Sequence, residues 1–239
     1  WTKPVDGSLR SADWQGLHPV KEIIQIFNPA TGWIQNTNNW PFSAAGVGAN
    51  SSSPRVQDFP RYMWSNGENA RGLHAVKVLK DAKNLDLDSL IKLAYDSELT
   101  AFESLLPPLF KAYEAKPDPM LAEQIQSLRN WDMRATLDST ATSLAIYWAQ
   151  DLVLQHGGEA KYKNIPIVDY LPSVSAPALL AALKRASQRL QDDFGKWQTP
   201  WGEINRVEGL SGGVNATHDD TKLNWPVAFA SGTLGSFAA

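Results

Sequence analysis

The chain contains no cysteine among its 239 residues, which excludes disulfide bonds, thiol nucleophiles and zinc sites with cysteine ligands. It also lacks a dominant charge, since 22 basic side chains stand against 25 acidic ones. No stripe of Lys and Arg alternates with aromatic residues, so we expect no nucleic-acid partner. No apolar run approaches the roughly 20 residues that cross a bilayer, and residues 1–10 do not have the pattern of a signal peptide. A membrane partner is therefore not expected.

Several common catalytic motifs are missing as well. There is no G-x-S-x-G elbow, no H-E-x-x-H pair and no other zinc spacing, and no G-x-G-x-x-G run follows a strand. The four histidines, His18, His74, His156 and His218, are isolated along the chain. We interpret each of them as a surface or helix-capping residue.

Ten tryptophans are present, and most of them stand beside Asn, Asp, Gly or Pro, as at Trp14, Trp33, Trp40, Trp131 and Trp201. Large amphipathic rings at such positions can line a pocket or hold loops in place. Both interpretations of these tryptophans are open at this point.

The texture of the sequence divides the chain into three parts, which we interpret as one incomplete domain. Residues 1–65 are rich in Gly, Pro, Asn and Ser, with short strand-like runs at residues 23–27 and 32–37 and a small polar loop at 43–55. Residues 66–195 have helical periodicity, and residues 196–239 look like strands and loops. The sequence therefore predicts an α+β fold in which a helical region is flanked by short strands and loops.

Capping residues and breakers predict where three of the helices begin and end. One buried stripe follows a cap at Asp86 or Asp88, and Pro107 and Pro108 stop it; its members are Leu90, Ile91, Ala94, Leu99 and Phe102. A second helix follows a cap at Asp138 or Ser139, includes residues 144–152 and ends at Gly157. A third begins at Ser175 and Pro177 and ends at Gly195, with an inner face of Leu180, Leu183, Ala186 and Leu190.

Two polar segments have a functional and a structural interpretation. THDD, residues 217–220, supplies hard oxygen donors that could bind a cation, although such a run is more often a turn or a helix cap. RNWDMRATLDS, residues 129–139, places Arg129, Asp132, Arg134 and Asp138 close together, which favours structural ion pairing.

The segment NPATGWIQNTNN, residues 28–39, carries three asparagines within its last four residues. If it is an extended strand, Ile34, Asn36 and Asn38 share one face, and Asn38 lies at the end of the strand. Asparagine favours turns, so one interpretation is a simple turn. The other is that a rigidly held amide donates to an oxyanion during acyl transfer, a contribution of about 3 kcal/mol.

The flanking motifs favour the second interpretation. DWQGL at residues 13–17, FNPATGWIQNTNNWPF at 27–42 and a W-x-N-G-x-x-A-R run at 64–71 resemble, in order and approximate spacing, the large subunit of penicillin acylases. LRNWDMRATLDS at 128–139 and WGEINRV at 201–207 look like the helical insertion of that family and its return to the sheet. The resemblance spans nearly the whole chain and is most specific before residue 72.

This resemblance implies an N-terminal nucleophile hydrolase with an αββα sandwich, made as a precursor that cuts itself into two subunits. In that family the first residue of the large subunit attacks the amide carbonyl and its own α-amine acts as the base. By position, Asn38 would complete the oxyanion hole and Arg71 would orient the site and the substrate. No cofactor is needed for the chemistry, and Asp58 would be one ligand of a structural calcium ion.

Residue 1 is Trp, which has no nucleophilic atom, so we expect this chain to be an internal piece of the large subunit and inactive alone. Its partners would be an N-acyl substrate, the small subunit and the rest of the large subunit. The substrate would be a β-lactam side chain, an acyl-homoserine lactone or a related acyl amide, and the resemblance implies a periplasmic or secreted location. The alternative is a non-catalytic helical module whose Trp and Asn residues bind a glycan or a peptide.

Overall fold

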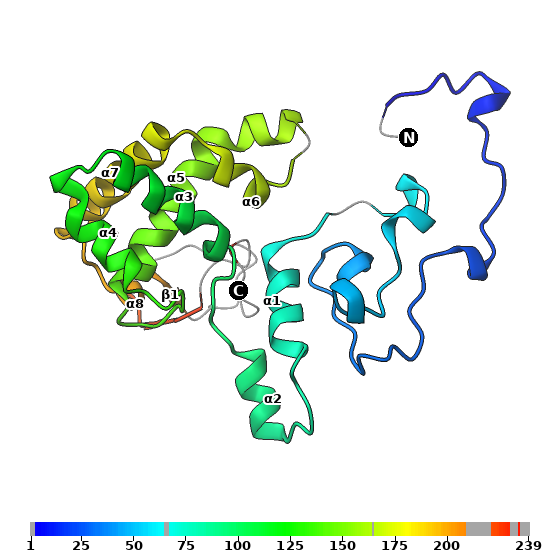
Figure 1. Ribbon diagram of the computed structural model, residues 1–239, viewed down its shortest axis with the longest axis horizontal. Helices are drawn as coiled ribbons and strands as arrows, with labels where there is room; N and C mark the ends of the chain where they lie inside the picture. The colour runs from blue at the N-terminus through cyan, green and yellow to red at the C-terminus, as the bar shows by residue number, and fades with distance from the viewer. Residues whose placement is uncertain (1–2, 65–66, 164, 209–220, 230–233, 235–239) are drawn as a thin grey trace.

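A computed structural model of the chain describes residues 3–64, 67–163, 165–208, 221–229 and 234. An irregular N-terminal segment lies beside a bundle of helices, and two shorter helices, α1 (Ala70–Leu79) and α2 (Leu87–Ala94), connect the two (Figure 1). The described residues are mostly helical, with a two-stranded sheet, which agrees with the α+β prediction. The αββα sandwich stays a prediction.

The N-terminal segment has no regular secondary structure beyond short 3₁₀ turns. These are η1 (Arg10–Ala12), η2 (Val20–Glu22), η3 (Pro41–Ser43), η4 (Gly48–Asn50), η5 (Val56–Asp58) and η6 (Arg61–Met63). The strands predicted at 23–27 and 32–37 are wrong, because neither stretch pairs with a strand in the described part of the chain. Positive φ angles at Asn28, Gly32 and Asn38 interrupt the extended backbone that such pairing requires.

Helices α1 (Ala70–Leu79) and α2 (Leu87–Ala94) both begin at a side-chain cap. The Asp86 carboxylate accepts from the Ser89 N–H at 2.8 Å, as predicted. The buried stripe predicted from Leu90 to Phe102 is wrong, since α2 ends at Ala94 and contains no buried residue. The chain turns between residues 95 and 101, so that Leu99 and Phe102 reach the core while Leu90 and Ile91 stay exposed.

Helix α3 (Phe102–Ala115) contains Pro107 and Pro108 in its interior, although these prolines were expected to stop a helix. Interior prolines cost about 3 kcal/mol because they remove hydrogen bonds to the preceding turn. Burial of the leucines on either side of the pair offsets this cost; these are Leu105, Leu106 and Leu109. Apolar burial therefore decides the local conformation here.

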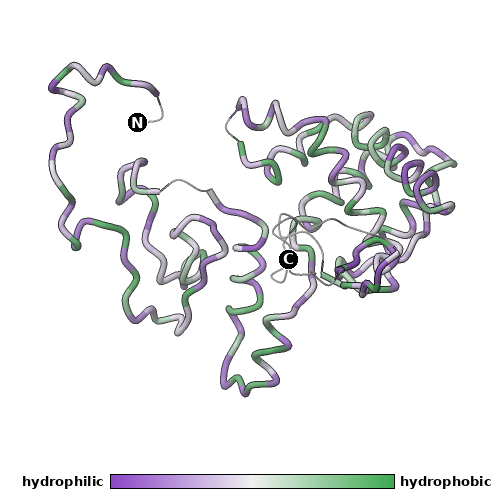
Figure 2. The backbone as a smooth tube through the Cα atoms, turned by 180° about the vertical axis from the view of Figure 1, so that it is seen from behind, coloured by the Kyte–Doolittle hydropathy of each residue, from purple (hydrophilic) through white to green (hydrophobic). Residues whose placement is uncertain are grey.

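The bundle consists of α3, α4 (Ala122–Arg129), α5 (Thr140–Lys163) and α7 (Ala176–Phe194), with η7 (Pro119–Leu121), α6 (Ile167–Tyr170) and η8 (Leu171–Ser173) between them. Helix α7 packs against both α3 and α5. The core includes fully buried Trp148, whose indole N–H donates to the Leu179 carbonyl at 3.1 Å. Hydrophobic and hydrophilic residues are interspersed along these helices (Figure 2). Helix α7 buries one face, whereas residues 141–146 of α5 are all buried.

The predicted limits of α5 and α7 have different outcomes. The Ser139 hydroxyl accepts from the Thr142 N–H at 3.1 Å, which confirms the N-terminal cap of α5. Gly157 does not end this helix, which continues to Lys163 and buries Ala160. Helix α7 ends where predicted, at Gly195 with a φ of 79°.

After the bundle, α8 (Trp201–Ile204) precedes strands β1 (Arg206–Glu208) and β2 (Asn224–Pro226). The strands are antiparallel, with Val207 opposite Trp225. Among the described helices, none is long and apolar enough by itself to cross a membrane, although the bent pair Ile167–Ser173 and Ala176–Phe194 would qualify when taken together.

Candidate active site

The asparagine loop, residues 36–39, is a tight turn that lies against the start of α1. The Asn38 N–H donates to the Asn36 side-chain oxygen at 2.9 Å, and the Thr37 N–H donates to the Asn39 side-chain oxygen at 3.2 Å. Asn38 itself has a φ of 58°, a left-handed conformation that asparagine tolerates better than most residues. Asn36 and Asn39 therefore have the turn-forming role of the first interpretation. The strand predicted to place Ile34, Asn36 and Asn38 on one face does not form in the described part of the chain.

Asn38 and Arg71, which are 33 positions apart, are in direct contact. The Arg71 Nη2 donates to the Asn38 side-chain oxygen at 3.2 Å. A guanidinium has only donors, so it must face the oxygen of the carboxamide and not its NH₂ group. The N–H bonds of Asn38 consequently lie on the side of the carboxamide that faces away from Arg71.

The position of Arg71 is set by the N-terminal cap of α1. The Asn69 side-chain oxygen accepts from the Gly72 N–H at 2.8 Å, and the Asn69 side-chain NH₂ donates to the Thr37 carbonyl at 3.1 Å. One side chain thus begins the helix that carries Arg71 and also holds the loop that carries Asn38.

Asn38 lines a cavity of about 720 Å³ between this loop and the end of the bundle. The facing wall comes from α5 and α6 and from the residues between them: Lys161, Ile165, Pro166 and Asp169. The described residues that line the cavity include no Ser, Thr or Cys. None of these described residues could therefore act as a hydroxyl or thiol nucleophile.

Aromatic rings form the near wall of the cavity. Trp40 and Trp64 meet edge to face with 5.9 Å between ring centroids, and Phe42 packs against both. The Arg61 guanidinium stacks on Trp64 at 3.9 Å. These tryptophans both line the cavity and hold the loop, so the two interpretations of the Trp residues apply together here.

Charges of both signs surround the opening. Arg61 and Lys161 contribute cations, whereas Glu68 and Asp169 contribute carboxylates. Partial burial and the nearby negative charge of Glu68 raise the pKa of the Asp169 carboxyl. A molecule bound in the cavity would therefore lie near both cationic and anionic side chains.

Asp58 lies apart from this arrangement. Both of its carboxylate oxygens accept from Arg55 at 2.9 Å. Within the described ranges, Asp58 does not belong to any group of three or more His, Cys, Asp or Glu residues close enough to share an ion. The role of Asp58 as a calcium ligand stays a prediction.

A buried ionic cluster at the far end of α1 was not anticipated from the sequence. His74 is fully buried, its Nδ1 lies 2.8 Å from the Thr100 hydroxyl, and its Nε2 lies 3.4 Å from an Asp96 oxygen. Burial lowers the pKa of His74 despite the carboxylates of Asp96 and Glu98 nearby. The expectation that His74 is a surface or capping residue is therefore wrong.

The negative charges of Asp96 and Glu98 in this cluster are paired with cationic side chains. His74, Asp96 and Glu98 bring potential ligand atoms within 4.8 Å of one another. However, Arg134 Nη1 contacts Asp96 Oδ2 at 2.8 Å, and Lys77 bonds to Glu98. These cations compete with any metal ion, so we interpret the cluster as a structural ion network that joins α1 to residues 96–100.

The two ambiguous polar segments have different outcomes. Arg129 pairs with Glu114 at 2.6 Å and Arg134 with Asp96, which confirms structural ion pairing for the two arginines of residues 129–139. Asp132 accepts instead from the Arg134 backbone N–H, and Asp138 from the Thr136 hydroxyl. The THDD segment, residues 217–220, lies outside the described residues.

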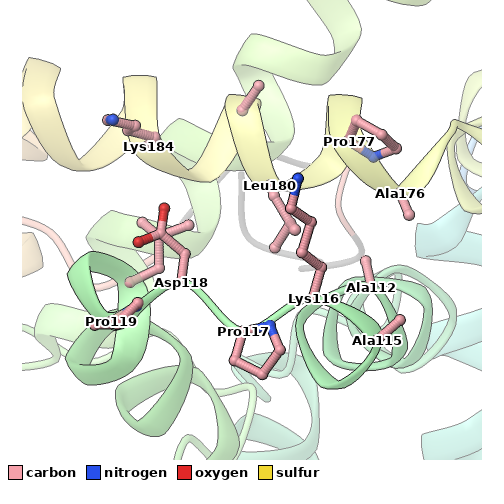
Figure 3. A pocket seen from close by; sticks show the side chains of 12 residues that line it. Ala112, Ala115, Lys116, Pro117, Asp118, Pro119, Ala176, Pro177, Leu180 and Lys184 are labelled. Carbon is pink, nitrogen blue, oxygen red and sulfur yellow. The ribbon is translucent and has the colours of Figure 1, made fainter.

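A second cavity, of about 410 Å³, lies between the end of α3 and the face of α7 (Figure 3). Its walls are mostly alanine, proline and leucine side chains, with Lys116, Asp118 and Lys184 around them. None of its lining residues borders the cavity at Asn38. It is a separate feature of the bundle.

Comparison with known proteins identifies relatives of the chain. The penicillin amidase family model matches residues 2–233. The acyl-homoserine lactone acylase PvdQ of Pseudomonas syringae pv. syringae (strain B728a) is 24% identical over 233 residues, which cover 87% of this chain and 29% of that relative. The chain thus spans less than a third of the length of this curated relative.

Proposed function

The chain belongs to the penicillin amidase family, and on that premise we propose that it is part of an acylase that hydrolyses the amide bond of N-acyl compounds. β-Lactam side chains, acyl-homoserine lactones and related acyl amides are the substrate classes that the proposal covers. The observation that carries it is the Asn38–Arg71 contact at the edge of the large cavity.

In the proposed mechanism, Asn38 is a donor for the oxyanion. Attack on an amide carbonyl produces a tetrahedral intermediate with negative charge on oxygen, and donors that are held in place beforehand stabilise this charge. The hydrogen bond from Arg71 fixes the carboxamide oxygen, and the N–H bonds are therefore held in one direction. The positive charge of Arg71 also polarises the carboxamide and makes its N–H groups better donors.

The proposal places the nucleophile outside the residues that line the cavity. An N-terminal nucleophile hydrolase uses the hydroxyl or thiol of the first residue of a subunit, with the α-amine of the same residue as the base. The described lining supplies the donor, Asn38, but no hydroxyl or thiol. The orienting cation, Arg71, is not among the lining residues and reaches the site through its hydrogen bond to Asn38. The remaining part of the protein would bring the nucleophile to the open side of the cavity.

The proposal predicts a difference between the isolated chain and the full-length protein. Full-length, processed protein should release the free amine from a fatty acyl-homoserine lactone or from a penicillin, measured with an amine-reactive fluorophore. The purified 239-residue chain should release none under the same conditions. Turnover by the isolated chain would place the nucleophile within this sequence, and an inactive full-length protein would favour the non-catalytic binding module.

A further inference from the structure

We infer that Glu68 is a positioning residue for the Asn38 donor, an inference that rests on the proposed function. Glu68 precedes α1 and is half-buried between this helix and the asparagine loop. Its hydrogen-bond donors are Asn39, Trp40 and Asn69, which neighbour Asn38 and Arg71 in the sequence, and it acts through them. Three observations support the role.

First, the Glu68 carboxylate accepts three hydrogen bonds from two parts of the chain. Oε1 accepts from the Asn39 side-chain NH₂ at 2.8 Å and from the Asn69 backbone N–H at 2.9 Å. Oε2 accepts from the Trp40 indole N–H at 3.0 Å. The carboxylate therefore joins the asparagine loop to the first turn of α1.

Second, these bonds fix the residues on either side of Asn38. Asn39 uses its NH₂ for Glu68 and for the Ser43 hydroxyl at 3.1 Å, and it uses its oxygen for the Thr37 N–H at 3.2 Å. The Asn39 side chain thus holds the backbone before Asn38 while Glu68 holds Asn39. The left-handed conformation of Asn38 is enforced from both directions.

Third, the same carboxylate is bound to the helix that carries Arg71. Its bond to the Asn69 N–H places a negative charge beside the N-terminus of α1, where the helix dipole favours it. Asn38 and Arg71, the two members of the proposed catalytic pair, are therefore both held relative to Glu68. A shift of this carboxylate would change the direction in which the Asn38 carboxamide points.

The chemistry of the three donors requires a carboxylate and not a neutral amide. All three groups that face Glu68 are N–H donors, and a glutamine would present an NH₂ group to at least one of them. Glu68→Gln therefore keeps the shape of the side chain but breaks one or more of the bonds. This makes it a more discriminating variant than Glu68→Ala.

The test is a double-mutant cycle in the full-length enzyme with Glu68→Gln, Asn38→Gly and the two combined. Glu68→Gln alone should lower kcat by about 10- to 100-fold with little change in KM, because charge-assisted hydrogen bonds are lost. In the Asn38→Gly background, Glu68→Gln should cause no further loss of kcat. Glu114→Gln, which removes a surface carboxylate on α3, is the control and should leave kcat unchanged.

The outcomes separate the inference from the proposed function. Equal losses of kcat from Glu68→Gln in both backgrounds, or no loss at all, would overturn the inference and show a purely structural role. Unchanged kcat in the Asn38→Gly variant, with normal folding by circular dichroism, would instead contradict the proposed function. Loss of kcat from Glu68→Gln that disappears in the Asn38→Gly background supports both.

Discussion

Gly72 packs so closely against Asn39 that a Cβ atom at position 72 would lie 2.3 Å from the Asn39 side-chain nitrogen. The same Cβ would lie 2.3 Å from Oε1 of Glu68. These two atoms are hydrogen-bonded to each other, so a Cβ at position 72 would have to displace both side chains together or break that bond. The close approach of helix and loop at the candidate site therefore requires glycine at this position.

Gly72→Ala should loosen the junction between the asparagine loop and α1. Overpacking costs about 1–3 kcal/mol, which outweighs the gain of up to about 1 kcal/mol that alanine brings to a helix interior. The measurement is native-state hydrogen exchange, in which the amides of residues 70–79 should exchange faster.

Gly158→Ala in α5 is the matched control for this prediction. A Cβ at Gly158 meets no atom within 4 Å, so only the helix propensity changes. This variant should slow exchange in α5 or leave it unchanged. Identical exchange of α1 in the wild type and Gly72→Ala would show that the packing at Gly72 is not as tight as described.

The buried His74 predicts a loss of stability on mild acidification. Burial lowers the pKa of His74 in the folded state below its ordinary value of 6.5, against the opposing effect of Asp96 and Glu98. The unfolded chain therefore binds more protons than the folded chain as the pH falls below about 6.5, and stability decreases with falling pH. The loss continues until the pH reaches the folded pKa.

Urea unfolding at pH 7.5 and 5.5 tests this linkage. The free energy of unfolding should fall more over this interval for the wild type than for His74→Gln, which cannot take up a proton. The ring resonances of His74 in an NMR titration should also have a midpoint below 6.5. Parallel pH dependence of the two proteins would rule out His74 as the source of the loss.

The sequence predicts best where the determining interactions are local. Caps at Asp86 and Ser139 and the exit at Gly195 depend on neighbouring residues, and the structure confirms them. Pro107 failed as a stop signal because burial of the leucines on both sides offsets its cost. Gly157 failed because a glycine inside a helix costs only about 1 kcal/mol, and the helix continues to bury Ala160. Such burial depends on contacts between distant helices, which periodicity does not reveal.

At the candidate site, too, the sequence predicted what depends on neighbouring residues and missed what depends on distant ones. A turn at residues 36–39 follows from asparagine chemistry, and the family resemblance singled out Asn38 and Arg71, which the structure brings together. Glu68 and His74 had no local signal. The two side chains that donate to Glu68 are 28 and 29 residues away, and Thr100, which bonds to His74, is 26 residues away. Only the folded arrangement identifies such residues.

The central claim is that the Asn38 carboxamide stabilises an oxyanion, and the kcat of Asn38→Gly in the full-length enzyme tests it most directly. Glycine accepts the φ of 58° at this position, so the variant removes the amide without straining the loop. Asn84→Gly, which alters another left-handed asparagine at a φ of 51°, is the matched control. We predict that Asn38→Gly lowers kcat by about 10²- to 10³-fold while Asn84→Gly leaves it unchanged; equal kcat values for the two variants would contradict the claim.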